Sequence, residues 1–218
     1  MNDVSGHDDE LRDFLARHLD PLDDHACEGG GRRSSDYDLT PGGWSGMPVD
    51  KLTPAAVLIG LIERPVGLTV LLTRRADTLR NHTGQVALPG GRQDPGETPV
   101  QTAVREAHEE VGVEPRFVEP VGLSTPYQTG TGYLITPVVG FVRPGFTLTA
   151  NPGEVADIFE TPFAWLMDLA NYQEHERALP NGELRRFYAA THDEQYIWGA
   201  TAGILRALHG RLYGAAVA

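Results

Sequence analysis

Three glutamates lie near the middle of the chain at spacings that an α-helix would bring onto one face. Glu106, Glu109 and Glu110 would fall within about a third of the helix circumference, since successive residues turn by ~100°. Like charges at this spacing repel each other on an exposed helix. Hard divalent cations bind such oxygens, and Mg²⁺ is shared between protein carboxylates and substrate phosphates. The alternative is an acidic, solvated helix face, and the helix alone does not decide between them.

Local signals at both ends define this helix. Thr98 is a good N-cap, Pro99 suits the first helical position, and Gln101 completes a capping box. Gly112 is placed to end the helix in a left-handed conformation. We therefore expect a helix from Pro99 to Val111. Its apolar face would consist of residues at helical spacing: Val100, Ala103, Val104, Ala107 and Val111.

A tight, glycine-bearing loop from Gly90 to Glu97 precedes the helix. Gly90 and Gly91 carry no Cβ, so their backbone carbonyls can approach a cation closely and add neutral oxygen ligands. Arg105 can reach Glu109 one helical turn away and offset part of the repulsion. The loop therefore favours a metal site over a merely solvated acidic face.

Upstream of the loop, positive charge gathers in an otherwise acidic chain. Arg74, Arg75, Arg80 and His82 lie close together in a protein whose formal net charge is −12 at pH 7. Guanidinium groups match phosphate oxygens, so this segment is a credible phosphate clamp. Each arginine alone would more often be a surface residue. As a cluster beside the loop, they predict substrate binding.

Composition restricts the class of protein. With 218 residues, 40% of them hydrophobic and 22% charged, the chain is typical of a soluble globular protein, and its acidic balance does not exclude an anionic small-molecule substrate. Its negative charge argues against a nucleic-acid partner. The longest apolar run, Pro54 to Ile62, is too short to span a bilayer, which argues against a membrane partner. The start shows no secretory signal, and a single cysteine, Cys27, fits a reducing cytosol, so we expect a cytoplasmic protein.

The chain divides into an N-terminal segment, residues 1–50, and a compact domain, residues 51–218. In the first segment we expect an amphipathic helix over Asp9 to Leu19 and then an irregular, glycine-rich arm up to Val49. In the domain, β-branched runs bounded by turn residues predict strands: Ala55–Ile62, Leu68–Thr73, Phe117–Leu123, Leu134–Val142 and Asp157–Glu160.

Further elements complete the expected domain. The first two strands should form a hairpin, and a second hairpin should pair Glu176–Leu179 with Leu184–Ala189 across an Asn181-Gly182 turn. Besides the acidic helix, we expect helices over Pro162–Ala170 and Glu194–Tyr213. Strands and helices mixed in this way predict an α/β sandwich around a mixed β-sheet.

The loop and the acidic helix together resemble a known signature. Gly91, five residues, Glu97, seven residues, and then Arg105-Glu106-Ala107-His108-Glu109-Glu110-Val111-Gly112-Val113 resemble the signature of the Nudix hydrolase family, with every fixed position filled. A match over 23 residues is highly specific. The resemblance implies a Nudix-type α/β/α sandwich, dependence on Mg²⁺ or Mn²⁺, and hydrolysis of a nucleoside diphosphate linked to another group.

The resemblance also implies a metal-binding set. Glu106 and Glu110, one turn apart, would be the first-ranked metal ligands. Glu109 would be a further ligand or the group that activates water, and Gly90 would offer a backbone carbonyl. Which carboxylate serves as the general base differs between family members and stays open here.

Three more residues belong to the expected catalytic group. By resemblance, Glu97 and Arg105 would orient the acidic cluster. Glu154, within Asn151 to Val155, is our candidate for a carboxylate contributed from outside the helix. The alternative for Glu154 is a surface acid with no catalytic part.

The basic segment resembles the extra motif of coenzyme A pyrophosphatases, a Nudix subgroup. Leu71 to Ala76, Arg80, Gly84 and Pro89-Gly90-Gly91 match, while Leu88 stands where the motif has phenylalanine. The resemblance implies that water attacks the pyrophosphate of coenzyme A, or of an acyl-coenzyme A, releasing 3′,5′-adenosine bisphosphate and 4′-phosphopantetheine. Family habit also suggests a homodimer, although no interface signature is visible.

Two other functions are weighed against this one. A Nudix enzyme for ADP-ribose, dinucleotide polyphosphates or oxidised nucleotides would share the acidic helix, but the arginine segment disfavours it. A non-catalytic Nudix module that senses a nucleotide usually loses signature carboxylates, and here all are present.

Overall fold

The computed structural model describes residues 4–23, 33–39, 47–76, 84–178 and 184–214, with side chains from Glu10 onward in the first helix. Several residues singled out in the sequence lie outside these ranges: Cys27, Arg80, His82, Leu179 and the Asn181-Gly182 turn. Within the described chain, no helix is long and apolar enough to cross a membrane.

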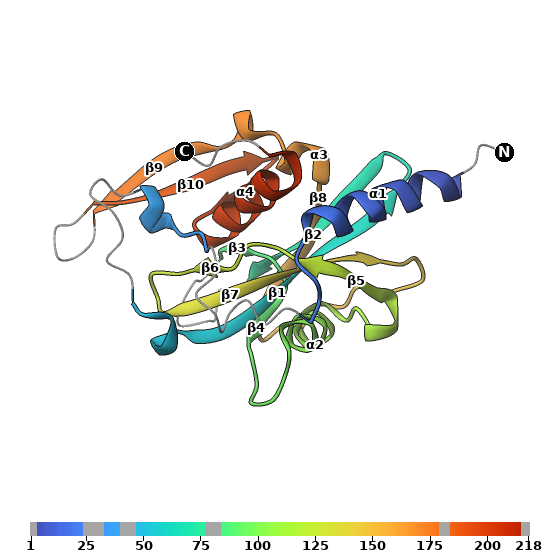
Figure 1. The fold of residues 1–218 in the computed structure, drawn as a ribbon, viewed down its shortest axis with the longest axis horizontal. Coiled ribbons are helices and arrows are strands. Elements are labelled where there is room, and N and C mark those ends of the chain that lie inside the picture. Colours follow the sequence, from blue (N-terminus) through green and yellow to red (C-terminus); the bar gives the residue numbers. More distant parts are fainter. Residues whose placement is uncertain (1–3, 24–32, 40–46, 77–83, 179–183, 215–218) are drawn as a thin grey trace.

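A mixed, eight-stranded sheet forms the centre of the protein (Figure 1). Its main path runs β3-β2-β1-β7-β5, with β4 paired to β1, β6 to β7 and β8 to β2. The β1–β7 pair is parallel and the other pairs are antiparallel. The strand bounds are β1 Thr53–Arg64, β2 Gly67–Arg75, β3 Val86–Ala87, β4 Gly90–Arg92, β5 Val118–Leu123, β6 Tyr127–Gln128, β7 Tyr133–Val142 and β8 Val155–Pro162.

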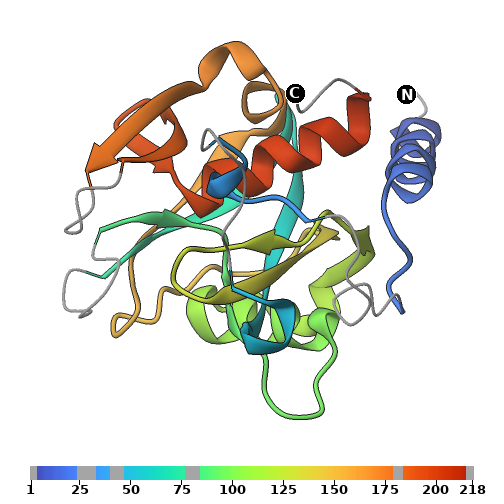
Figure 2. The ribbon, with the colours of Figure 1, turned by 60° about the vertical axis from the view of Figure 1, so that its left-hand side comes forward.

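A second, antiparallel sheet has the order β11-β10-β9 and lies with helix α4 above the central sheet (Figure 2). Its strands are β9 Gln173–Ala178, β10 Leu184–His192 and β11 Gln195–Trp198. The α-helices are α1 Val4–His18, α2 Pro99–Val111, α3 Phe163–Leu166 and α4 Ala200–Tyr213. Short 3₁₀ helices are η1 Asp36–Leu39, η2 Val49–Lys51, η3 Pro115–Phe117 and η4 Leu169–Asn171.

Alternating side chains of β1 divide the core into two layers. Ala56, Leu58 and Ile62 point toward α2, whereas Val57 and Ile59 point toward α4 and the second sheet. The side chains of both layers are buried. Figure 2 shows α2 below the central sheet and α4 above it. The expected α/β/α sandwich around a mixed sheet is therefore confirmed.

Most of the expected strands are present. The β1–β2 and β9–β10 hairpins form, and β5, β7 and β8 contain the other expected runs, except that Phe117 belongs to η3. One expectation about the glycine loop needs correction. Gly90–Arg92 is not part of a loop but forms strand β4, because Gly90 and Gly91 pair with Val57 and Ala56 of β1.

Two of the predicted helices are shorter in the structure than the sequence suggested. Gln195–Trp198, expected to begin the last helix, forms β11, which pairs with β10. Gly199, at φ 58°, turns the chain so that helix α4 begins only at Ala200.

The helix expected over Pro162–Ala170 is reduced to the four residues of α3, followed by η4. Side chains form hydrogen bonds with backbone N–H and C=O groups that would pair with each other in a longer helix. Asp168 accepts a hydrogen bond from Ala170 N at 3.0 Å, and Asn171 Nδ2 donates to Trp165 O at 2.8 Å. These contacts end the helix after one turn.

The N-terminal segment contacts the rest of the chain at several points. Leu15 of α1 is fully buried within the core. Asp20 pairs with Leu123 in an isolated bridge and accepts hydrogen bonds from Arg211 at 2.7 and 2.6 Å. Ser34 forms a second bridge with Tyr127. The division at residue 50 stays a prediction.

Leu15→Ala is expected to lower the free energy of unfolding by about 2–5 kcal/mol, because it opens a cavity in the core. Urea unfolding followed by circular dichroism would measure the change. Arg17→Ala, on the exposed side of the same helix, is the control and should change the free energy by no more than about 0.5 kcal/mol. Equal unfolding curves for the two variants would show that α1 does not stabilise the core.

Candidate active site

Helix α2 begins and ends where its sequence signals predict. Thr98 Oγ1 accepts from Gln101 N at 3.2 Å, and Gln101 Oε1 accepts from Thr98 N at 2.8 Å, which makes the capping box. Gly112 closes the helix at φ 76°. Because Ala103, Ala107 and Val111 are buried against the sheet, the orientation of the helix is fixed. The three glutamates, of which Glu110 is itself buried, therefore have defined positions.

Arg105 is the hub of the acidic cluster. Its Nε and Nη2 donate to the two oxygens of Glu97 at 2.8 and 3.0 Å. Its Nη1 donates to Glu106 Oε1 at 2.7 Å and to Glu109 Oε2 at 3.2 Å. Nη2 also donates to the carbonyl of Arg92 in β4 at 3.1 Å. The guanidinium of Arg105 thus connects the glutamates of α2 to strand β4 through hydrogen bonds.

Glu97 is the ionised carboxylate that holds Arg105 in place. The hydrogen bonds from Arg105, with a smaller contribution from Thr102, lower the pKa of Glu97 to about 2. Thr102 Oγ1 donates to Glu97 Oε2 at 2.8 Å, and Asp94 N donates to the same oxygen at 3.1 Å. Glu97 therefore remains charged at any physiological pH and holds Arg105 in place.

Glu110 has a different environment. It is 3% exposed, and burial raises its pKa to about 7. Its Oε2 accepts from Gly90 N at 3.2 Å, and its Oε1 lies 3.9 Å from Arg75 Nη1. One hydrogen bond and one arginine at 3.9 Å offset only part of the cost of burying this negative charge. A bound cation would stabilise the charged form of Glu110.

The two glycines of β4 allow the sheet and the helix to approach closely. A Cβ on Gly90 would lie 2.4 Å from the carbonyl oxygen of Ala56, inside the β1–β4 pair. A Cβ on Gly91 would lie 2.6 Å from Glu106 Oε1. Gly90 is therefore required by the backbone of the sheet, and Gly91 by a carboxylate of the site.

Gly91→Ala is expected to reduce kcat/KM about 10-fold while leaving the thermal unfolding midpoint nearly unchanged. The new methyl group must displace the flexible end of Glu106 by several tenths of an ångström, and a full 1 Å misplacement in an active site can cost ~100-fold. Steady-state kinetics and calorimetry on the same preparation would measure both effects.

The control for that variant is Gly153→Ala, whose Cβ would meet Asn151 Oδ1 at an ordinary 3.4 Å. Unchanged activity in Gly91→Ala would show that the position of the Glu106 carboxylate does not limit the reaction.

Glu154 lies in the exposed turn before β8. Its carbonyl accepts a hydrogen bond from Ala76 N at 2.8 Å, which places the turn beside the end of β2. Its charge contributes to raising the pKa of Glu106 and of Glu110, although burial is the larger cause in both. The turn therefore brings this carboxylate into the electrostatic range of the helix, and its catalytic part stays a prediction.

The structure places the two adjacent arginines of the basic segment, Arg74 and Arg75, differently with respect to the site. Arg75 lines a cavity that also touches Gly90 and Gly91, whereas Arg74 is not among the cavity-lining residues. Only Arg75 of these two arginines faces the cavity, and substrate binding by Arg74 stays a prediction. Arg80 and His82 lie outside the described residues.

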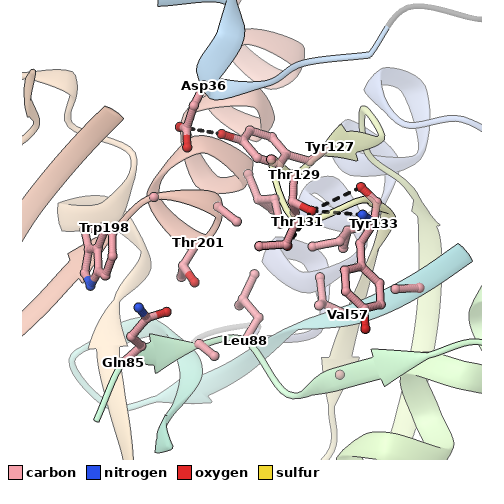
Figure 3. Close-up of a pocket in the computed structure, with 18 of the residues that line it drawn as sticks. Asp36, Val57, Gln85, Leu88, Tyr127, Thr129, Thr131, Tyr133, Trp198 and Thr201 are labelled. Atoms are coloured by element: carbon pink, nitrogen blue, oxygen red, sulfur yellow. Dashed lines mark hydrogen bonds between the residues drawn. The ribbon is translucent and has the colours of Figure 1, made fainter. Parts of the chain in front are cut away.

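The cavity has a volume of about 490 Å³ and lies between the central sheet, the second sheet and the first turn of α4 (Figure 3). Aliphatic side chains line it from both sides, Val57 and Leu88 from the central sheet and Ile204 from α4. Leu88, the departure from the expected motif, is 4% exposed and belongs to the core. In Figure 3, Asp36 lies across the space from Leu88, and Trp198 lies at the left of the space.

Sequence reasoning missed much of the cavity wall: Asp36, Tyr127, Arg177, Arg185 and Phe187. They come from the N-terminal arm, β6, β9 and β10, which meet only in the folded protein. The Asn-Gly turn predicted the β9–β10 hairpin, but no local pattern indicates that its inner face covers the site.

The acidic residues suit a hard divalent cation by their chemistry. Glu106 and Glu110 offer carboxylate oxygens beside a strand whose glycines leave room for them. In the described part of the chain, no three His, Cys, Asp or Glu side chains are already grouped as a metal site. Arg105 instead bridges Glu106 and Glu109, so metal ligation by these residues is a proposal.

Comparison with known proteins gives a consistent result. The family model described as NUDIX domain matches residues 51–182. A protein named "Uncharacterized Nudix hydrolase NudL" from Photorhabdus laumondii is 43% identical over 155 residues, which are 71% of this chain and 82% of that protein. The NudL protein of Escherichia coli O7:K1 is 42% identical over 156 residues, 71% of this chain and 80% of its own.

Among solved structures, an Ap4A hydrolase binary complex from C. elegans is similar with a TM-score of 0.45 at 17% identity. The match covers 50% of this chain and 80% of that chain. The range of the family model contains all of α2 and the whole segment from β2 to β4.

Proposed function

This chain belongs to the Nudix hydrolase family, and we propose that it hydrolyses the pyrophosphate of coenzyme A with Mg²⁺ or Mn²⁺ as cofactor. As a Nudix pyrophosphohydrolase it acts on a small nucleotide-type substrate. The observation that carries the proposal is the junction of three features. The cavity, Arg75 and the glycines of β4 meet beside the buried carboxylate of Glu110.

We assign the cation to Glu106 and Glu110, with the carbonyl of Gly90 as a further ligand. A bound divalent cation supplies charge neutralisation for the pyrophosphate and acidifies water. Arg105 and Glu97 are positioning residues, because Glu97 holds Arg105 and the guanidinium of Arg105 in turn holds Glu106 and Glu109 through hydrogen bonds. Arg75, at the cavity wall, can donate to a phosphate oxygen.

The chemistry is the attack of a water oxygen on one phosphorus of the pyrophosphate. The bond from that phosphorus to the bridging oxygen breaks, and 3′,5′-adenosine bisphosphate and 4′-phosphopantetheine leave. Glu109 has the most exposed carboxylate of the helix face, with 55% of its side chain accessible, whereas Glu106 has 14% and Glu110 has 5%. We therefore propose Glu109 as the group that accepts the proton of the attacking water, with Glu154 as the second candidate.

The substrate is tested with the purified protein, Mg²⁺ or Mn²⁺, and four compounds: coenzyme A, acetyl-coenzyme A, ADP-ribose and 8-oxo-dGTP. Anion-exchange chromatography of the products should show 3′,5′-adenosine bisphosphate from coenzyme A. Cleavage of ADP-ribose or 8-oxo-dGTP without this product would contradict the coenzyme A assignment. Binding without any cleavage would indicate a nucleotide-sensing module instead.

Two expectations from the sequence stay predictions. A homodimer would be detected by size-exclusion chromatography with light scattering, and a monomer mass of 23.7 kDa would contradict it. A cytoplasmic location would be detected by cell fractionation.

A further inference from the structure

Two arginines stand directly opposite each other in the second sheet. Arg185 of β10 is the register partner of Arg177 of β9, and both line the cavity. Like charges at directly opposed positions destabilise a pair of strands. The next step of the same ladder shows the usual arrangement, since Arg186 faces Glu176 and its Nε donates to Glu176 Oε1 at 2.8 Å. Opposite charges therefore pair on the outer face, and like charges on the cavity face.

Only part of this positive charge is compensated within the described chain. Arg185 Nη2 donates to Asp36 Oδ2 at 3.3 Å, and Tyr127 OH donates to Asp36 Oδ1 at 2.6 Å. Arg185 also lies against Gly130, where a Cβ would be 2.2 Å from its Nη1. Arg185 is thus held in a fixed position by a single acid. For Arg177 the described residues provide no hydrogen bond or ion pair, so an anion between the two would remove the repulsion.

Aromatic rings continue the same inner face of the sheet. Phe187, two residues beyond Arg185, lies 5.3 Å from the ring centroid of Trp198, and both residues line the cavity. Aromatic faces stack on nucleobases, and such stacking tolerates any base. Paired arginines followed by aromatic rings therefore suit a phosphate that is attached to a nucleoside.

The arginine pair belongs to a different part of the cavity from the metal ligands. Gly90 and Gly91 approach the cavity from the central sheet, whereas Arg177 and Arg185 approach it from the second sheet. A substrate that spans the cavity can contact both walls at once. The two walls can therefore bind two separate phosphate groups of one molecule.

We propose that Arg177 and Arg185 bind a phosphate monoester that the substrate carries in addition to the pyrophosphate that is cleaved. The inference rests on the proposed function, because coenzyme A has such a group on its ribose and yields 3′,5′-adenosine bisphosphate. It assigns selection of the substrate to the second sheet, outside the glycine-bearing strand and the acidic helix. Nucleotides that lack the extra phosphate should be poorer substrates.

The first test compares coenzyme A with dephospho-coenzyme A, which lacks the monoester. The wild-type protein should prefer coenzyme A, and Arg177→Gln should reduce that preference, expressed as the ratio of the two kcat/KM values, about 10-fold through KM. This is the loss expected for one charge-assisted hydrogen bond. The matched control is Arg186→Gln, on the outer face of the same hairpin, which should keep the wild-type ratio.

The second test measures binding without catalysis. Isothermal titration of the metal-free protein with 3′,5′-adenosine bisphosphate and with AMP should show about 10-fold tighter binding of the bisphosphate. Arg177→Gln should lose this difference, and Arg186→Gln should keep it. Since Arg177 is exposed and Arg185 is paired with Asp36, the Arg177 variant does not disturb the buried contact.

The two tests separate the failure of this inference from the failure of the proposed function. Equal binding of bisphosphate and AMP, or an unchanged difference in Arg177→Gln, overturns the phosphate subsite even if coenzyme A is cleaved. Tighter binding of the bisphosphate that depends on Arg177 supports the subsite even if coenzyme A is not cleaved, and then only the proposed reaction fails.

Discussion

Glu110→Gln is expected to lower kcat/KM by about 1,000-fold, because a metal ion contributes several kcal/mol of transition-state stabilisation that depends on its ligands. Glutamine keeps the shape of the side chain, and its amide oxygen can still accept the hydrogen bond from Gly90 N. It removes the charge that a cation would bind. Steady-state kinetics at saturating Mg²⁺ would measure the loss.

The same variant should stay folded, because replacing a buried charge by a neutral amide removes a desolvation penalty. Circular dichroism and thermal unfolding would show this. Glu114→Gln is the matched control, since Glu114 forms an exposed ion pair with Arg116 just beyond the same helix. A turnover number near that of the wild type in Glu110→Gln would refute the assignment of Glu110 as a metal ligand.

Arg105→Lys is expected to lower kcat/KM by about 100-fold, the upper part of the range seen when groups that orient metal ligands are changed. Lysine keeps the charge but not the planar fork that reaches Glu97, Glu106 and Glu109 together. Glu106 should then be less well oriented, so the Mg²⁺ concentration for half-maximal activity should also rise. That second measurement separates a positioning effect from a general loss of stability.

Arg116→Lys is the control for this substitution, because its partner Glu114 is exposed and ion pairs of this kind contribute little. If Arg105→Lys kept both its kcat/KM and its Mg²⁺ requirement, the network around Arg105 would have no part in preparing the site.

Local signals account for the part of the site that the sequence predicted well. The capping box at Thr98, the apolar stripe and Gly112 all act within a few residues, so the bounds of α2 agree with expectation. The positions of Glu106, Glu109 and Glu110 on the helix follow from these bounds. The close approach of Gly91 to Glu106 is also a consequence of residue type, although the sequence suggested a role for its carbonyl rather than for its missing Cβ.

The remaining differences arise from contacts between distant segments. We expected Gln195–Trp198 in the last helix, although Tyr, Ile and Trp are enriched in strands, and pairing with β10 makes the segment a strand. Asp36 lies in an arm for which we expected no regular structure, but its carboxylate meets Tyr127 inside the cavity wall. Such positions depend on tertiary packing between distant segments, which a local sequence pattern does not encode.

The pairing of Asp36 with Arg185 has a consequence for the order of events during synthesis. The two residues are 149 positions apart, and Arg211 and Asp20 are 191 apart. Closing loops of this length is entropically unfavourable and slow, so contacts of this kind form late in folding. A nascent chain that has reached β8 already contains every carboxylate we assign to the reaction, but about a third of the cavity-lining residues, all from Arg177 onward, are still missing. The capacity to bind metal should therefore arise on the ribosome before the capacity to choose a substrate.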